Sequence, residues 1–143
     1  MIERDLKAQA WSKTRGQQMS RAHSAKKVQA VLDKTHGHCA YCGIVVQPAW
    51  TKGRDRLCVD HIRSRHYGGK NDTANLAAVC HRCNCMKRAK DLEEYRRLLH
   101  ERLYASFTPQ HIAHLESLGI VLPAHFPGYP RYLFWFEQQG LSL

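Results

Sequence analysis

Apolar residues recur at helical spacing in the first third of the chain. The earliest periodic segment predicts a helix over residues 25–34, with Ser24 as its N-cap and Gly37 beyond its end. Its apolar face would consist of Val28, Val31 and Leu32. We expect this short helix to pack on the core that follows it in the sequence.

Short β-rich runs follow and predict strands. Residues 57–62 and 76–79 are such runs, and residues 82–88 suit a helix directly after the second one. A further short strand is expected at 44–46. The loop between the two main strands contains the turn-forming stretch 68–72.

The last third of the chain predicts two helices and an aromatic tail. Asp91 and Glu94 have the spacing of a capping box, and Thr108 followed by Pro109 begins the second helix. The apolar face of the first helix would be Leu92, Tyr95, Leu98, Leu99 and Leu103. The tail at 132–136 is expected to be a strand or an extended clamp on the domain.

The composition allows one small domain with extensions. Of the 143 residues, 43% are hydrophobic. A unit of about 50 residues is only marginally stable unless a bound metal ion or another cross-link holds it together. We therefore expect an α+β fold, with a metal-stapled core and flanking helices. The expected parts are a basic N-terminal arm at 1–23, a core at 24–90, and a helical and aromatic extension at 91–143 that packs on the core.

The excess of basic over acidic residues is confined to the first 90 residues. Residues 1–38 carry 8 Lys and Arg against 3 Asp and Glu, residues 39–90 carry 10 against 3, and residues 91–143 carry 4 against 6. This distribution favours a polyanionic partner, above all nucleic acid, docking on the first two parts. On charge alone, a merely soluble basic surface is the commoner interpretation.

The chain shows no sign of a membrane or secretory segment. No apolar run approaches the length of a transmembrane helix, and the polar start at 1–5 lacks the apolar centre of a signal peptide. We therefore expect a cytoplasmic protein without membrane association. In that compartment its six cysteines are expected to act as thiolate ligands rather than as disulfides.

Two Cys-x-x-Cys pairs predict a structural Zn²⁺ site with the ligands Cys39, Cys42, Cys80 and Cys83. A site closed by four thiolates has no vacant position, so its ion would hold the fold rather than catalyse. The 37 residues between the pairs exceed the roughly 15–20 of a zinc ribbon, and the strand–loop–strand segment occupies the excess. Competing ligands close in sequence are Cys58, Cys85, His38 and His81. Cys58 is most simply a buried strand residue, and Cys85 is too near Cys83 to share its ion easily.

The segment from the first cysteine pair to just beyond the second offers the groups that phosphodiester hydrolysis needs. These are a base for the water, a metal ion for the developing charge, and positive groups for the strand. The neutral imidazole of His61 suits the base, because its ordinary pKa lies near working pH. The Asp60 carboxylate and the Asn84 amide suit a hard ion such as Mg²⁺. Neighbours on a strand point to opposite sides, so Asp60 could hold the ion while His61 faces the water.

The ordered motifs over residues 24–90 resemble the HNH endonuclease family. They are Cys-x-x-Cys, Asp-His-Ile, Gly-Gly-x-Asn-Asp, Asn-Leu and Cys-x-x-Cys-Asn-x-x-Lys. The resemblance implies a ββα-metal fold of the structural-zinc subset. It also implies a metal-dependent DNA endonuclease that leaves 5′-phosphate and 3′-hydroxyl ends, in a prokaryotic or phage-like setting.

The same resemblance implies roles for individual residues. His61 would be the general base, Asp60 and Asn84 the ligands of the catalytic ion, and Asn75 the residue that braces the histidine-bearing loop by hydrogen bonds. Lys87, one helical turn beyond Asn84, would lie near phosphate. Further DNA contacts are expected from Arg63, Arg65 and Arg88. Because the third signature position is Asn84 rather than histidine, the catalytic ion is expected to be Mg²⁺ or Mn²⁺ rather than Zn²⁺.

Other interpretations share part of this evidence. Residues 63–66 replace the apolar residue and proline that the family often has there, and we interpret them as added phosphate contacts. The main alternative is a non-catalytic, zinc-stapled module that binds nucleic acid. Another is an adaptor that recruits a partner through its aromatic tail after its nuclease centre has decayed. We expect a monomer or weak dimer, with the C-terminal extension as a possible protein contact; nicking and double-strand cleavage both stay open.

Overall fold

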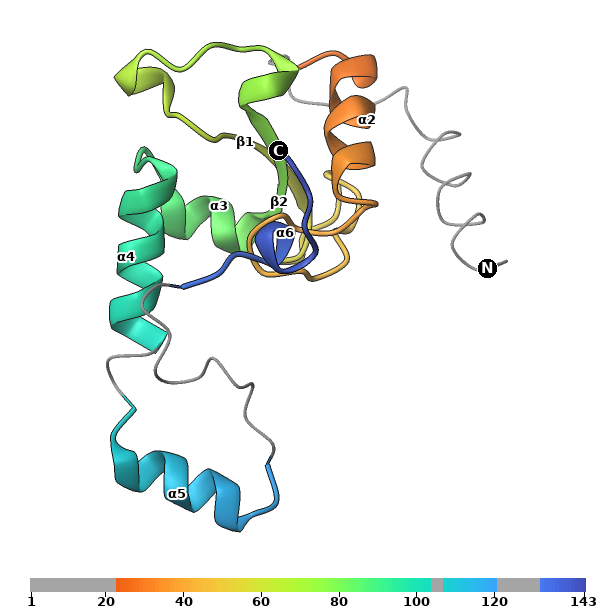
Figure 1. Cartoon of the computed structure of the whole chain (residues 1–143). Coiled ribbons are helices and arrows are strands. Elements are labelled where there is room, and N and C mark those ends of the chain that lie inside the picture. Colours follow the sequence, from red (N-terminus) through yellow and green to blue (C-terminus); the bar gives the residue numbers. More distant parts are fainter. Residues whose placement is uncertain (1–22, 104–106, 121–131) are drawn as a thin grey trace.

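The computed structural model describes residues 23–103, 107–120 and 132–143, and the chain is α+β (Figure 1). Its elements in order are α2 (Ala25–Lys34), β1 (Leu57–His61), η1 (Arg65–Tyr67), η2 (Thr73–Asn75), β2 (Leu76–Cys80), α3 (His81–Lys87), α4 (Leu92–Leu103), α5 (Pro109–Ser117) and α6 (Trp135–Gln138). None of the helices in these ranges is both long and apolar enough to cross a bilayer.

A two-stranded sheet and the helix after it form the ββα core. β1 pairs antiparallel with β2, from Leu57 opposite Cys80 to His61 opposite Leu76. All five residues of β2 are buried, as expected for an apolar strand covered on both faces. α2 packs against β2, and α3 packs against both strands. Both predicted strands and the predicted helix after them are confirmed.

The helix before the first cysteine pair has the predicted bounds and caps. The Ser24 hydroxyl accepts a hydrogen bond from the Lys27 amide at 3.3 Å, which satisfies one free N–H of the first turn. Beyond the last turn, Gly37 has a φ of 76° and donates its amide to the Leu32 carbonyl. The three residues of its predicted apolar face are all buried. The N-terminal arm expected at 1–23 lies, except for its last residue, outside the described residues.

The strand expected at 44–46 does not form, and this prediction is wrong. The segment makes one isolated bridge, between His38 and Val45, and the following residue Gln47 bridges to Arg56. Only Val46 of the three is buried, while Ile44 and Val45 are about half exposed. A strand needs a continuous partner, and the tight turn after Cys42 leaves only single bridges.

The first helix of the C-terminal extension has the predicted capping box. The Glu94 amide donates to Asp91 Oδ1 at 2.8 Å, and the Asp91 amide donates to Glu94 Oε2 at 2.9 Å. Residues of α4 enter the core, including Tyr95 and Leu99. By contrast, α5 has no buried residue and stands apart from the core in Figure 1. Of the extension, it is therefore α4 and the last described segment that supply core residues.

The aromatic tail packs on the core through one buried ring and acts as a clamp. It contains the short helix α6, and the strand that was the other expectation does not form. Phe134 is fully buried, with its ring 5.1 Å from that of Tyr41 and 5.7 Å from that of Tyr95. The guanidinium of Arg96 lies 4.6 Å from the centre of the Phe134 ring and pairs with Glu137 at 2.6 Å. This pair attaches the end of the chain to α4.

Removing the Arg96 charge should release the clamp. We expect Arg96→Met to lower the free energy of unfolding by about 3 kcal/mol, because it removes the buried guanidinium that pairs with the Glu137 carboxylate. Urea titration with zinc present in excess measures this change. Arg97→Met, at the exposed neighbouring position, is the matched control and should change stability little. Equal effects of the two substitutions would contradict the clamp.

Candidate functional site

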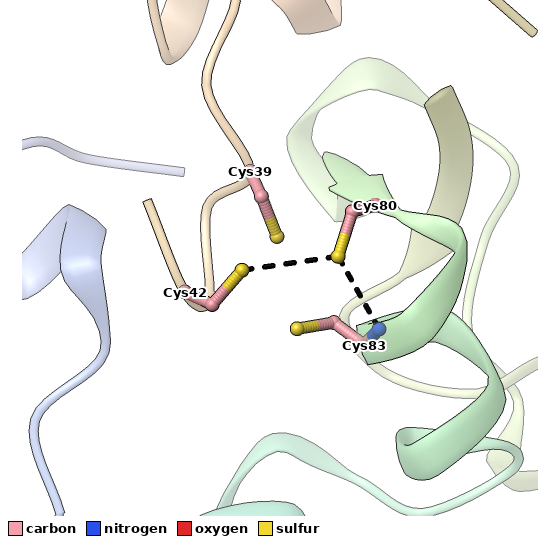
Figure 2. Close-up of side chains that lie close together, drawn as sticks. All are labelled: Cys39, Cys42, Cys80 and Cys83. Carbon is pink, nitrogen blue, oxygen red and sulfur yellow. Dashed lines mark hydrogen bonds between the residues drawn. The ribbon is translucent and has the colours of Figure 1, made fainter. Parts of the chain in front are cut away.

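Four cysteine side chains converge where the first knuckle meets the ββα core (Figure 2). Cys39 and Cys42 lie before the sheet, Cys80 ends β2 and Cys83 lies in α3. Their sulfur atoms all lie within 4.8 Å of one another, with Cys42 and Cys80 Sγ 3.8 Å apart. Sulfurs bound tetrahedrally at about 2.3 Å from zinc stand about 3.8 Å from each other. The predicted cluster is therefore present and could hold a metal ion.

The chemistry of the four thiols also fits a soft cation. Contacts among them lower the pKa of Cys42, mainly through Cys39, to about 7, and the pKa of Cys80 is lowered as well. The pKa of Cys39 is raised, chiefly by its contact with Cys42. Thiols crowded in this way cannot all ionise without a compensating positive charge, which a bound divalent ion supplies.

The competing ligands belong to other surroundings. His38 stacks on Trp135, with ring centres 4.9 Å apart. Cys58 and Cys85 instead approach His81, whose Nδ1 lies 3.7 Å from each sulfur. Within the described part of the chain, the four paired cysteines form the group of three or more ligands that could surround one ion.

A glycine closes the first knuckle. Gly43 has a φ of 78°, and its amide donates to the Cys39 carbonyl at 2.9 Å. A Cβ atom at this position would stand 2.2 Å from Cδ1 of Trp135. Both the positive φ and the close approach of the indole therefore require glycine here.

Asp60 is buried and held from two directions. Its Oδ2 accepts a hydrogen bond from the Tyr41 hydroxyl at 2.7 Å and lies 2.9 Å from Nζ of Lys87. Burial raises the pKa of the Asp60 carboxyl, and the charge of Lys87 opposes that increase. A buried carboxylate is tolerated because a cation and a hydroxyl replace its lost hydration.

The expectation that Lys87 contacts phosphate needs correction. Its side chain is fully buried, and its ammonium also donates to the His61 carbonyl at 2.8 Å. Lys87 lies four residues after the buried Cys83 and therefore shares the inner face of α3. The lysine holds the end of β1 and presents no surface to DNA.

His61 follows Asp60 on β1, and neighbours on a strand point to opposite sides. The ring of His61 is half-buried, and its buried Nε2 has no hydrogen-bond partner among the described residues. The ring of His23 lies 5.8 Å away, and burial followed by the proximity of His61 lowers the pKa of His23. No sequence motif predicts this contact, because His23 lies ahead of α2 and His61 lies at the end of β1.

Asn75 braces the loop that follows His61. Its Oδ1 accepts from the Arg63 amide at 2.9 Å, while its Nδ2 donates to the carbonyls of Arg63 at 3.0 Å and Lys70 at 2.8 Å. Gly69 allows this close packing, since a Cβ there would stand 1.8 Å from the Arg63 carbonyl oxygen. The hydrogen bonds implied by the family resemblance are therefore present.

Asn84 and the three arginines occupy accessible positions. Asn84 is half-buried in α3, one turn before Lys87, and its side chain accepts or donates no hydrogen bond within the described residues. Arg63, Arg65 and Arg88 are exposed, and Arg63 Nε donates to the Tyr67 carbonyl at 2.8 Å. α3 thus leaves the Asn84 side chain partly accessible, and the loop after β1 presents the positive charge of Arg63 and Arg65 to solvent.

Comparison with known proteins gives a family match over part of the chain. Residues 39–90 match the family model described as HNH endonuclease, which confirms the resemblance for that segment. Among solved structures, the Type II-C Cas9 enzyme from Actinomyces naeslundii aligns with a TM-score of 0.46 and 21% identity. That alignment covers 82% of this chain and 13% of the Cas9 chain, so this chain spans a small part of that protein. The comparison with curated proteins gave no match.

Removing one cluster thiol should abolish metal retention. Cys80→Ser is expected to lower bound zinc well below one ion per chain and to unfold the core, because structural zinc contributes roughly 10–16 kcal/mol of apparent binding free energy in small domains. Metal analysis and circular dichroism measure both effects. Cys85→Ser, outside the cluster, is the control and should keep its zinc. Full zinc retention by Cys80→Ser would contradict the assigned ligands.

Loss of the Asn75 amide should loosen the loop after His61. We expect Asn75→Ala to cost about 2 kcal/mol of stability and to accelerate hydrogen exchange at the Arg63 amide, because its acceptor is removed. Hydrogen-exchange NMR measures the second effect. Asn71→Ala serves as control, since Asn71 contributes its backbone carbonyl to Lys27 and any residue supplies that group. Unchanged exchange at Arg63 would refute the bracing role.

Proposed function

We propose that this chain is a metal-dependent DNA endonuclease that hydrolyses phosphodiesters with His61 as general base. The observation that carries the proposal is the four-cysteine cluster at the ββα core, because the segment that contains it matches the HNH endonuclease model. That segment contains Asp60 and His61 at the end of β1 and Asn84 in α3. The core at 24–90 would be the catalytic unit, with Zn²⁺ on the four cysteines as a structural ion.

The proposed catalytic ion is Mg²⁺ or Mn²⁺, and the available donors fit it. Asp60 Oδ2 is taken by Tyr41 and Lys87, whereas Oδ1 accepts no hydrogen bond from the described residues. The side-chain oxygen of Asn84 is similarly without a partner there. Such an oxygen pair suits a hard cation that keeps several waters. When bound, the ion would supply positive charge for the developing phosphorane and the leaving 3′ oxygen.

The remaining steps belong to the chain's own residues. In the proposal, the imidazole of His61 takes a proton from the attacking water, and Asn75 holds the loop that follows the histidine. The exposed Arg63, Arg65 and Arg88 would hold the DNA backbone, so affinity should fall steeply as salt rises. Lys87 is left out of this group because it is buried.

One observation favours the alternative of a non-catalytic, zinc-stapled module that binds nucleic acid. The Asp60 carboxylate is already neutralised by the buried Lys87 ammonium, and Nε2 of His61 is enclosed. A module that only binds would keep the basic surface and the metal cluster and would have no use for the imidazole.

Plasmid cleavage separates these two functions. With Mg²⁺ or Mn²⁺, the wild type is expected to cut supercoiled DNA, and His61→Ala should be slower by about 10²–10⁴-fold, the usual contribution of a general base. His66→Ala, an exposed histidine in the neighbouring loop, is the matched control and should retain most activity. Equal cutting by wild type and His61→Ala would rule out His61 as the base. Binding without any cutting would favour the non-catalytic module.

A further inference from the structure

A tyrosine connects the cysteine cluster with the proposed catalytic carboxylate. Tyr41 lies between Cys39 and Cys42 and is completely buried. Its hydroxyl donates to Oδ2 of Asp60 at 2.7 Å across 19 residues of sequence. The loop that supplies half of the metal ligands therefore also supplies a direct hydrogen bond to Asp60.

The helix that carries Cys83 reaches the same oxygen atom. Cys83 and Lys87 lie one turn apart in α3, and the Lys87 ammonium stands 2.9 Å from Asp60 Oδ2. The same ammonium donates to the His61 carbonyl at 2.8 Å. Both holders of the carboxylate thus belong to segments that a bound ion would tie together.

Only one oxygen of the carboxylate is held in this way. Oδ2 receives the Tyr41 hydroxyl and the Lys87 ammonium, whereas Oδ1 receives no hydrogen bond from the described residues. Two contacts to the same oxygen restrict rotation of the carboxylate and leave the other oxygen available. A carboxylate fixed before an ion arrives loses less conformational freedom on binding it.

We propose that Tyr41 and Lys87 are positioning residues that fix Asp60 through Oδ2, so that Oδ1 is available to the divalent ion, and that the cysteine cluster sets this geometry through them. The inference rests on the proposed function, in which Asp60 ligates that ion. It gives the cluster a second role: besides holding the fold, it orients the carboxylate of the active site.

The structure offers a variant that removes only the relevant hydroxyl. The Tyr41 ring packs on the rings of Tyr95 and Phe134, with centres 5.4 and 5.1 Å away, and Tyr41→Phe keeps these contacts. Tyr95→Phe is the matched control, because Tyr95 is buried in the same aromatic group and does not contact Asp60. Asp60→Asn gives the baseline for an impaired site.

The test measures Mn²⁺ binding to the zinc-loaded full chain in the absence of DNA. Electron paramagnetic resonance of the free Mn²⁺ ion reports the amount that is not bound. A hydrogen bond to a charged group is worth enough to change affinity about tenfold or more. We expect Tyr41→Phe to weaken Mn²⁺ binding about tenfold, with zinc content and thermal midpoint close to wild type. Tyr95→Phe should bind Mn²⁺ as the wild type does.

Three results would overturn the inference. Tyr41→Phe could bind Mn²⁺ with wild-type affinity, or Tyr95→Phe could weaken binding equally, which would assign the effect to packing. If the wild type binds Mn²⁺ weakly and Asp60→Asn leaves that affinity unchanged, Asp60 does not ligate the ion and the proposed ion site is refuted. Plasmid cleavage separates failure of the positioning role from failure of the proposed function. A chain that binds Mn²⁺ through Asp60 and cuts no DNA contradicts the nuclease activity and leaves the positioning role intact.

Discussion

The convergence of four thiols is the constraint on which the rest of this structure depends. The cluster joins the loop at Cys39 and Cys42 to the junction of β2 and α3, two segments separated by 37 residues. The sheet between them has only two strands, and such a sheet is rarely stable by itself in water. A metal ion on the cluster would supply free energy that so small a core cannot obtain from apolar burial alone.

A second layer of organisation is polar and buried. Inside the core, the Asp60 carboxylate contacts the side chains of Lys87 and Tyr41. Each of these polar side chains would be costly to bury alone. Together they connect α3, β1 and the first knuckle around the end of the strand that bears His61. The active-site candidates are thus positioned by rigid elements rather than by the exposed loop that follows them.

The C-terminal extension divides into parts with different relations to the core. Tyr95 of α4 and Phe134 of the tail complete an aromatic group with Tyr41, and Arg96 joins the two segments by its pair with Glu137. Residues far from the nuclease-like motifs therefore pack on the same tyrosine that contacts Asp60. By contrast, α5 contributes nothing buried, and its apolar residues remain available to solvent.

Local patterns determined much of this protein from the sequence. The caps at Ser24 and Asp91, the two strands and the cysteine pairs are encoded by residues close together in the chain, so spacing alone predicted them. The failed strand at 44–46 and the burial of Lys87 were decided by tertiary structure. A strand requires a partner, and the environment of a lysine depends on which face of its helix meets the sheet. Likewise, only the folded chain brings Tyr41 to Asp60 and His23 to His61, because these contacts join residues with no sequence signal between them.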